Sequence, residues 1–325
     1  MTLLVPSNRP PARFYRGGAR ITAFRGEPPA ADREPEDWVG STTTIAGEER
    51  LGLTTLPDGR LLRDAVAADP EHWLGREHVA RFGDDVRLLV KLLDAGQRLP
   101  VHAHPSDEWA AGHLGHAHGK AEAWYILEGG TVHVGLREDV DAAALRDLVE
   151  RQDTAGLLAL LHEVEVAPGD VVWVPPGELH AIGAGVFLLE LQQPEDLSIL
   201  LEWEGFALDG ARDGHLGVGF DTALGAVNLR ARRDVSELVG TIPGAGSMFP
   251  VGADQYFRLD RVIVDGHATL DRGFAILVVA DGELSLEREG DVALVRGATA
   301  IVPAAAGHVR LRGSGTVLVC RPPAP

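Results

Sequence analysis

Residues 169–180 read GDVVWVPPGELH, and this stretch decides the fold. Its apolar run, Val171 to Val174, predicts a short β-strand with a glycine before it and a proline- and glycine-containing turn after it. His180 follows this turn. The spacing Gly169-x5-Pro175-x-Gly177-x2-His180 therefore presents one imidazole just beyond a strand and a turn, where it could bind a metal ion.

Three further metal-binding side chains precede this stretch. His102 and His104 are two residues apart on a predicted strand, so both imidazoles share one face of it. Glu122 lies on the next predicted strand and is followed by six residues and a glycine. Adjacent antiparallel strands bring inward-facing side chains close together, and one ion needs its ligands about 2.0 to 2.2 Å away. We therefore predict one divalent metal ion bound by His102, His104, Glu122 and His180. The alternative is a barrel whose histidines are only hydrogen-bonded core residues.

Strand-like runs around these residues predict a mainly β fold of the barrel or sandwich type. They are Val86–Leu93, Pro100–His104, Ala121–Leu127, Thr131–Gly135, Val171–Val174 and Val186–Gln192. Leucines and valines at helical spacing over residues 141–164 predict a helical hairpin inserted in this barrel. Residues 1–80 read as short strands with one helix over 61–68, and a second helix is expected over 234–239.

We predict two domains. The loop Thr241 to Pro250, rich in glycine and proline, separates a metal-binding domain (1–240) from a C-terminal β domain (241–325). The spacing Gly297-x5-Pro303 repeats that of the first barrel, which indicates a second barrel. Ala275 stands where the repeat would need a carboxylate, so this domain is expected to carry no metal.

The composition limits the classes of partner and the compartment. The chain has 30 basic and 48 acidic residues, a net charge of −18, which disfavours nucleic acid and anionic membranes as partners. The single cysteine, Cys320, cannot form an internal disulfide, and the N-terminus has no apolar signal core, so we expect a cytoplasmic protein. Only Lys91 and Lys120 among the basic residues are lysines, which suggests a specific need for an ammonium group, although chance survival explains them equally well.

Together the motifs form the two-part cupin signature, and the surrounding blocks resemble the type I mannose-6-phosphate isomerases, the zinc-dependent phosphomannose isomerases of the cupin superfamily. The resemblance covers most of residues 12–205, whereas the C-terminal β domain agrees only in architecture. The similar blocks are Glu36–Gly40, Arg87–Ala95, Leu99–Pro105, Gly119–Tyr125, Pro175–Gly183 and Leu189–Gln193.

The chain departs from this family at three positions. His102 replaces the family's usual glutamine ligand, giving a three-histidine, one-glutamate site that widens the choice of metal from zinc towards iron, manganese or nickel. The family's catalytic arginine falls on Leu200, and Arg16 stands where the family usually has tryptophan.

The resemblance implies two jelly-roll barrels and a metal-dependent aldose–ketose isomerase that converts mannose 6-phosphate to fructose 6-phosphate through a cis-enediol. It implies that Lys120, on the same strand face as Glu122, acts beside the metal ion; the alternative is a solvated strand residue. Arg16 is a candidate to replace the missing arginine. Glu178 is a candidate general base, although an exposed turn glutamate is the simpler interpretation. Lys91 either has a role in the reaction or neutralises a buried carboxylate.

Two other functions stay open at this point. A sugar-binding or regulatory cupin that retains metal but has lost turnover would explain Leu200. A cupin dioxygenase would use the same four ligands with iron, but it assigns no purpose to the Lys120 and Glu36 blocks. For the isomerase and for the sugar-binding cupin, the expected partner is a sugar or sugar phosphate. No glycine-rich phosphate loop marks where a phosphate would bind.

Overall fold

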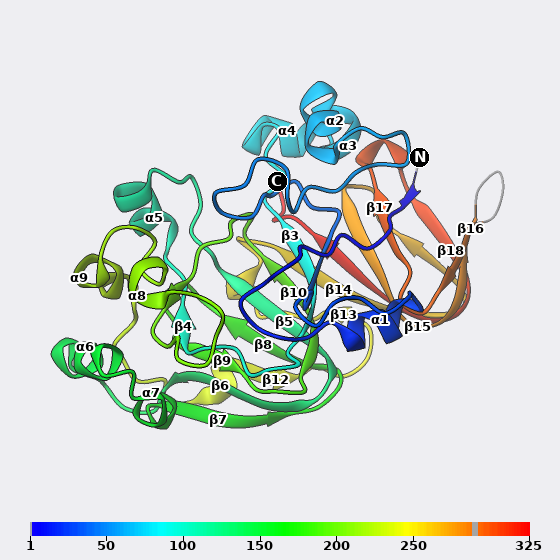
Figure 1. Ribbon diagram of the computed structural model, residues 1–325. Coiled ribbons are helices and arrows are strands. Elements are labelled where there is room, and N and C mark those ends of the chain that lie inside the picture. Colours follow the sequence, from blue (N-terminus) through cyan, green and yellow to red (C-terminus); the bar gives the residue numbers. More distant parts are fainter. Residues whose placement is uncertain (1, 288–291) are drawn as a thin grey trace.

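The computed structural model describes residues 2–287 and 292–325 and is built mainly from antiparallel β-strands in three sheets (Figure 1). This confirms the mainly β fold class. Among the described residues no helix is both long and apolar enough to cross a membrane.

Two of the sheets carry the site. The six-stranded sheet has the order β12 (Val239–Thr241), β8 (Asp170–Val174), β5 (Glu122–Glu128), β10 (Phe187–Gln192), β3 (Leu89–Asp94), β2 (Glu36–Val39). The five-stranded sheet has the order β11 (Ile199–Leu200), β4 (His102–Ala103), β9 (His180–Ile182), β6 (Gly130–Leu136), β7 (Leu161–Val166). Five of the six predicted core strands match these elements to within three residues at each end; the sixth, 100–104, shortens to the two residues of β4.

Alternation along the five-stranded sheet gives it two different buried faces. Ile182 belongs to the large core shared with the six-stranded sheet, whereas Ala181 and Ala103 belong to a second cluster with α6 and α7. Side chains two residues apart along a strand share a face. His102, His104 and His180 therefore point away from the second cluster and towards the space between the two sheets.

The third sheet contains the C-terminal strands. Its order is β1 (Leu3–Leu4), β17 (Thr299–Val302), β15 (Ala275–Leu286), β18 (Val309–Arg321), β14 (Arg258–Leu270), β13 (Gly246–Ser247), with β16 (Val292–Val295) beside β15. Two N-terminal residues thus pair with a strand almost 300 residues later, through Leu3 and Ile301. The large core also includes residues of this sheet, among them Ile276 and Leu318. The domain boundary at residue 240 stays a prediction.

The helices agree only in part with the sequence prediction. The insertion contains α6 (Ala142–Glu150) and α7 (Thr154–Ala159), but it ends earlier than expected because β7 begins at Leu161. The predicted helix over 61–68 is α2 (Leu62–Ala68). The helix expected over 234–239 is wrong: only the 3-10 turn η2 (Val235–Glu237) forms, and its end joins β12.

Several short helices lie where strands or loops were expected. They are α1 (Ala19–Arg25), α3 (Pro70–Leu74), α4 (Arg76–Phe82), α5 (Asp107–Leu114), α8 (Gly210–Asp213) and α9 (Phe220–Ala223), with 3-10 turns η1 (Leu224–Ala226), η3 (Val251–Ala253) and η4 (Ala304–Ala306). Capping explains two of them. Asp69 accepts a hydrogen bond from the His72 amide with Pro70 in the first turn of α3, and Ser106 accepts one from Trp109 in α5.

Candidate metal centre and adjoining cavity

Three imidazoles converge between the two sheets. His102 and His180 are cross-strand partners on β4 and β9, and their ring centroids are 4.0 Å apart. His104, the next inward-facing residue beyond β4, has its ring centroid 4.9 Å from that of His102 and 5.0 Å from that of His180. One nitrogen from each ring lies within 4.8 Å of the others, and all three residues are buried. This group could hold a metal ion.

The main chain fixes the orientation of all three rings. The Nδ1 atoms of His102, His104 and His180 lie 2.8, 2.7 and 2.9 Å from the carbonyl oxygens of Pro100, Leu197 and Glu178. A carbonyl oxygen only accepts hydrogen bonds, so each Nδ1 must carry the proton and each Nε2 keeps its lone pair. Hydrogen bonds of this kind are the usual means of fixing the tautomer of a metal-ligating histidine.

Burial and nearby charges keep the rings of His102 and His104 neutral. Burial, reinforced by the neighbouring histidines, holds the pKa of His102 well below its ordinary value. Burial, followed by the Lys120 ammonium, lowers the pKa of His104 to about 3. Neutral imidazole is the form that binds a metal ion, so these histidines are ready as ligands at neutral pH.

The Glu122 carboxylate adds negative charge at the same point. Its Oε2 lies 3.0 Å from His104 Nε2 and its Oε1 lies 3.1 Å from His180 Nε2. The Nε2 atoms of His104 and His180 present lone pairs, so each of these contacts brings two hydrogen-bond acceptors together. The buried His180 Nε2 has no hydrogen-bond partner among the described residues. Although burial opposes its ionisation, the Lys120 ammonium holds the pKa of Glu122 well below its usual range. A cation fits this donor set, since nitrogen and carboxylate ligands suit zinc and related ions.

Lys120 lies beside the three histidines, as its position two residues before Glu122 predicts. Its Nζ is 2.9 Å from Glu122 Oε2 and donates to His104 Nε2 at 3.1 Å. The side chain is buried, so the structure contradicts the alternative of a solvated strand residue.

A narrow cavity adjoins the centre and is lined by charged side chains from five segments. They are Arg13, Glu36, Lys91, Lys120, Glu122, Glu190 and Asp196, with Tyr15, His102 and Leu200 among the others. Of the groups that the sequence suggests, the cavity contains Lys120, Glu122 and His102, together with several charged groups that the sequence does not suggest.

Buried ion pairs connect the charges of this cavity. Arg13 lies 3.0 Å from Glu36 and 3.4 Å from Asp196, and Lys91 lies 3.3 Å from Glu190 and 3.6 Å from Glu36. Lys91 thus neutralises buried carboxylates, one of its two predicted roles, and it also faces the cavity.

The three carboxylates of this network differ in proton affinity. Burial opposes ionisation at all of them, but Arg13 and Lys91 together lower the pKa of both Glu36 and Asp196. At Glu190 burial prevails despite Lys91, and the negative charge of Glu122 adds to it, so the pKa is raised. Glu190 is therefore the carboxylate of this set that most readily carries a proton.

Two candidate catalytic residues lie elsewhere. The Arg16 side chain is 66% exposed, faces Asp32 at 4.0 Å and does not line the cavity. Glu178 is buried rather than exposed, so the interpretation as an exposed turn residue is wrong; its Oε2 pairs with Arg232 at 2.8 Å. Its main-chain carbonyl holds His180, which links Glu178 to the centre through the backbone.

The segment 110–119 contains three histidines, His113, His116 and His118, that make a separate set of contacts. His116 lies 2.9 Å from Glu195, and the buried His118 lies 2.6 Å from Asp85. His113 belongs to α5, so the segment 110–119 is partly helical rather than an extended loop. Neither His116 nor His118 lines the cavity beside the three histidines.

Sequence reasoning missed Arg13, Tyr15 and Asp196. Tyr15 donates a hydrogen bond to Glu36 Oε1 at 2.7 Å, and Trp38 donates to Glu36 Oε2 at 2.7 Å. The Glu36-Asp-Trp38 block gave a signal for this carboxylate but not for the groups that surround it.

The fold and the site define a cupin protein with a candidate metal centre. A family model described as the cupin domain of mannose-6-phosphate isomerase matches residues 247–322. For this C-terminal segment the sequence had indicated a resemblance to these isomerases in architecture only. The chain is similar to mannose-6-phosphate isomerases, in agreement with the resemblance found in its sequence.

Relatives of this family align with different shares of the chain. Mannose-6-phosphate isomerase ManA of Bacillus subtilis is 36% identical over 125 residues, 37% of this chain and 38% of that protein. The putative mannose-6-phosphate isomerase YvyI of the same organism is 28% identical over 263 residues, 76% of this chain and 79% of that protein. The chain spans at most about two fifths (34 to 39%) of the three curated relatives that are 36 or 37% identical to it.

Solved structures show the same fold. A putative mannosephosphate isomerase from Archaeoglobus fulgidus has a TM-score of 0.77 at 21% identity, with 99% of this chain and 98% of that chain covered. The mannose 6-phosphate isomerase of Bacillus subtilis has a TM-score of 0.75 at 23% identity, with 98% and 99% covered.

Proposed function

We propose that this protein is a metal-dependent aldose–ketose isomerase that interconverts mannose 6-phosphate and fructose 6-phosphate. The carrying observation is the set of three buried imidazoles whose Nδ1 atoms are held by main-chain carbonyls, with Lys120 beside them. Similarity to relatives that are named mannose-6-phosphate isomerases supports a sugar phosphate as the substrate class.

In this proposal one divalent metal ion is held by His102, His104, Glu122 and His180, and zinc is the metal we expect. A bound ion would supply Lewis-acid stabilisation of negative charge on the sugar oxygens, a contribution of several kcal/mol. The chain's own part is to present neutral nitrogens and one carboxylate in fixed orientations.

Lys120 is proposed to act on the sugar oxygens. His104 Nε2 has one lone pair, so it can accept a hydrogen bond from Lys120 or bind a metal ion, but not both. In the metal-loaded enzyme the Lys120 ammonium would lose this acceptor, keep its contact with Glu122 and have an N–H available for another partner. A sugar hydroxyl or carbonyl oxygen in the cavity is the natural one, and there Lys120 can give or take the oxygen-bound proton.

Glu190 is proposed to carry the carbon-bound proton. Aldose–ketose conversion removes a proton from C2 and returns one to C1, through the cis-enediol, while an oxygen-bound proton moves from O2 to O1. A group that does this near neutral pH needs a pKa above that of an ordinary carboxyl. The pKa of Glu190 is raised, whereas Arg13 lowers the pKa of Glu36 and Asp196.

Arg13 is proposed as the cation that replaces the arginine expected at Leu200. Both side chains line the cavity, and Arg13 is held there by Glu36 and Asp196. A guanidinium at this wall can stabilise negative charge on the substrate. The role suggested for Arg16 is thereby given to Arg13, because the exposed Arg16 does not reach the cavity.

The proposal is tested by assaying purified protein with mannose 6-phosphate and with unphosphorylated mannose, and by measuring binding of both sugars. We expect turnover of the phosphorylated sugar. Binding of the sugar phosphate without turnover would instead support a regulatory sugar-binding protein, and oxygen uptake by an iron-loaded protein would support a cupin oxygenase.

A further inference from the structure

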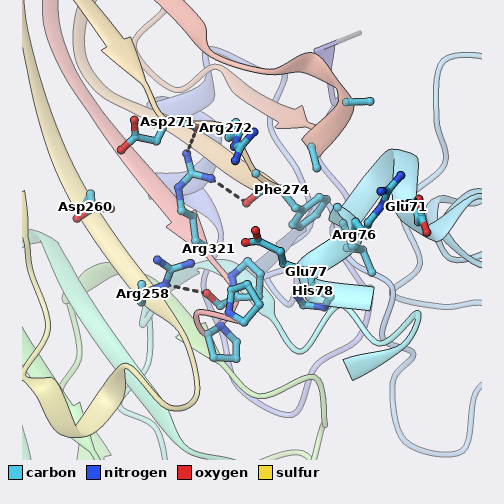
Figure 2. Close-up of a pocket in the computed structure, with 18 residues that line it drawn as sticks. Glu71, Arg76, Glu77, His78, Arg258, Asp260, Asp271, Arg272, Phe274 and Arg321 are labelled. Carbon is cyan, nitrogen blue, oxygen red and sulfur yellow. Dashed lines mark hydrogen bonds and ion pairs between the residues drawn. The ribbon is translucent and has the colours of Figure 1, made fainter. Parts of the chain in front are cut away.

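A cavity of about 480 Å³ lies between helices α3 and α4 and the ends of strands β14 and β18 (Figure 2). None of the residues that line it also lines the cavity beside the three histidines. Its volume falls in the range of small-molecule sites, roughly 300 to 1,000 Å³. It therefore has room for a metabolite of its own.

Two arginines face each other across the strands at one wall of this cavity. Arg258, the first residue of β14, is the cross-strand partner of Arg321, the last residue of β18. Directly opposed residues of an antiparallel pair point to the same side of the sheet, and like charges in this arrangement repel. Arg272, from the turn after β14, adds a third guanidinium to the lining.

Main-chain carbonyls hold the guanidinium groups of Arg258 and Arg321 in place. Arg321 Nη1 donates to the carbonyl of Phe274 at 3.2 Å and Nη2 to that of Asp271 at 2.7 Å, and Arg258 Nε donates to the carbonyl of Pro322 at 3.0 Å. Within the described part of the chain, no carboxylate lies within 4.0 Å of the guanidinium nitrogens of Arg258, Arg272 or Arg321, so none of the three forms a close ion pair.

The lack of a counter-charge is costly at Arg321. Arg321 is 8% exposed, and burial followed by the charge of Arg258 lowers its pKa, which Asp260 and Asp271 offset only in part. A buried charge without an ion partner is unfavourable, and an arginine does not escape this cost by losing its proton at physiological pH. An anion bound between these arginines would remove the repulsion and supply the missing charge.

Four acidic residues also line the cavity: Glu71, Glu77, Asp260 and Asp271. Glu77 extends from α4 towards the side of the cavity where Arg321 lies (Figure 2), and Asp260 lies on β14 two residues after Arg258. Neither forms an ion pair among the described residues. A carboxylate at the position of Glu77 can accept hydrogen bonds from hydroxyl groups.

We propose that this cavity binds a small phosphate monoester of a polyol. The phosphate group lies between Arg258, Arg272 and Arg321, and the hydroxyl groups face Glu77. Guanidinium groups are well suited to phosphate because their planar donors match its oxygens. The site is independent of the proposed isomerase reaction, and its test needs no turnover.

The test is calorimetric titration of the whole protein with glycerol phosphate and, separately, with inorganic phosphate. Arg258→Gln and Arg272→Gln should each weaken binding of both probes by about 10-fold, the cost of losing a charged hydrogen bond. Arg310→Gln, which removes an exposed arginine of the same strand β18 outside the cavity, should leave both affinities unchanged. Arg321 is left intact because its side chain also holds two main-chain carbonyls.

A second variant tests the hydroxyl contacts assigned to Glu77. Glu77→Ala should weaken binding of glycerol phosphate more than binding of inorganic phosphate, and an unchanged ratio of the two affinities would overturn the assignment to a polyol ester. The proposal as a whole is overturned if neither probe binds at millimolar concentration, or if Arg258→Gln and Arg272→Gln bind as tightly as Arg310→Gln. Binding that disappears only in Lys120→Met would assign the probes to the other cavity, which also contradicts the proposal.

Discussion

Leu200 is the cross-strand partner of His102 on strands β11 and β4, and both line the cavity beside the candidate metal centre. They are also two of the three positions at which the chain departs from the pattern of the type I mannose-6-phosphate isomerases that it resembles. The departures therefore meet at one point: an imidazole replaces an amide ligand, and the facing position loses its guanidinium. Arg13 brings a cation to the same cavity from the N-terminal segment.

This arrangement predicts a rescue. Arg13→Gln should lower kcat/KM about 10²- to 10³-fold, as expected for removal of a group that stabilises developing charge. Adding Leu200→Arg to that variant should restore part of the loss, because it returns a guanidinium to the cavity. Steady-state kinetics with mannose 6-phosphate provide the measurement, and Arg50→Gln, an exposed arginine far along the chain from these segments, is the control. Arg13→Gln with wild-type kinetics would rule out the role given to Arg13.

Lys120→Met should separate metal binding from turnover. We expect kcat to fall about 10²- to 10⁴-fold, the range for loss of a general acid or base. Metal affinity should be unchanged or higher, because the ammonium no longer competes for His104 Nε2. Kinetics and metal titration are measured on the same preparation. Loss of the metal together with turnover would show that Lys120 supports the ligands rather than the reaction.

Glu36→Gln should show that the buried ion pairs of Glu36 stabilise the fold. Breaking a buried pair costs about 3 to 5 kcal/mol, since Arg13 and Lys91 lose a shared partner. Burial alone would raise the pKa of Glu36, but Arg13 and Lys91 lower it below its usual range. Its ionised form therefore stabilises the fold above about pH 4.3, the ordinary glutamate pKa, and this contribution is lost as the pH falls towards the folded-state pKa.

Urea unfolding at pH 7 and pH 3.5 measures this difference. The gap in unfolding free energy between the wild type and Glu36→Gln should be larger at pH 7, while the exposed Glu49→Gln should show no gap at either pH. A gap that grows as the pH falls would contradict the stabilising role of the ionised Glu36 carboxylate.

His102→Gln should weaken metal binding about 10- to 100-fold, because an amide oxygen is a poorer ligand than a neutral imidazole for zinc, nickel and iron. Competition with a chromogenic chelator measures each affinity. Equal affinity in wild type and variant would remove His102 from the ligand set.

The sequence predicts the centre better than the cavity around it. His102, His104 and Lys120 could be placed because the two-residue period of a strand puts them on known faces, and His180 follows a recognisable turn. No local pattern links Arg13 to Asp196, which are 183 residues apart yet in contact. Such a pair is determined by the packing of whole segments.

The same limit explains the errors in the fold. Helices α3 and α4 have five and seven residues and are separated by Gly75, so neither shows a full period of apolar residues. Strand β1 has two residues and depends on β17 for its pairing, which no property of residues 3 and 4 could indicate. Glu178 was expected to be exposed because it lies in a turn, but Arg232, 54 residues later, covers it.

The central claim is that a metal ion at the three histidines and Glu122 drives isomerisation of a sugar phosphate. The most direct measurement is mannose 6-phosphate to fructose 6-phosphate conversion by metal-analysed protein, before chelation, after chelation and after stepwise return of zinc. We predict one metal ion per chain, loss of turnover on chelation, and recovery that saturates at one equivalent. Turnover that persists in metal-free protein would contradict the account.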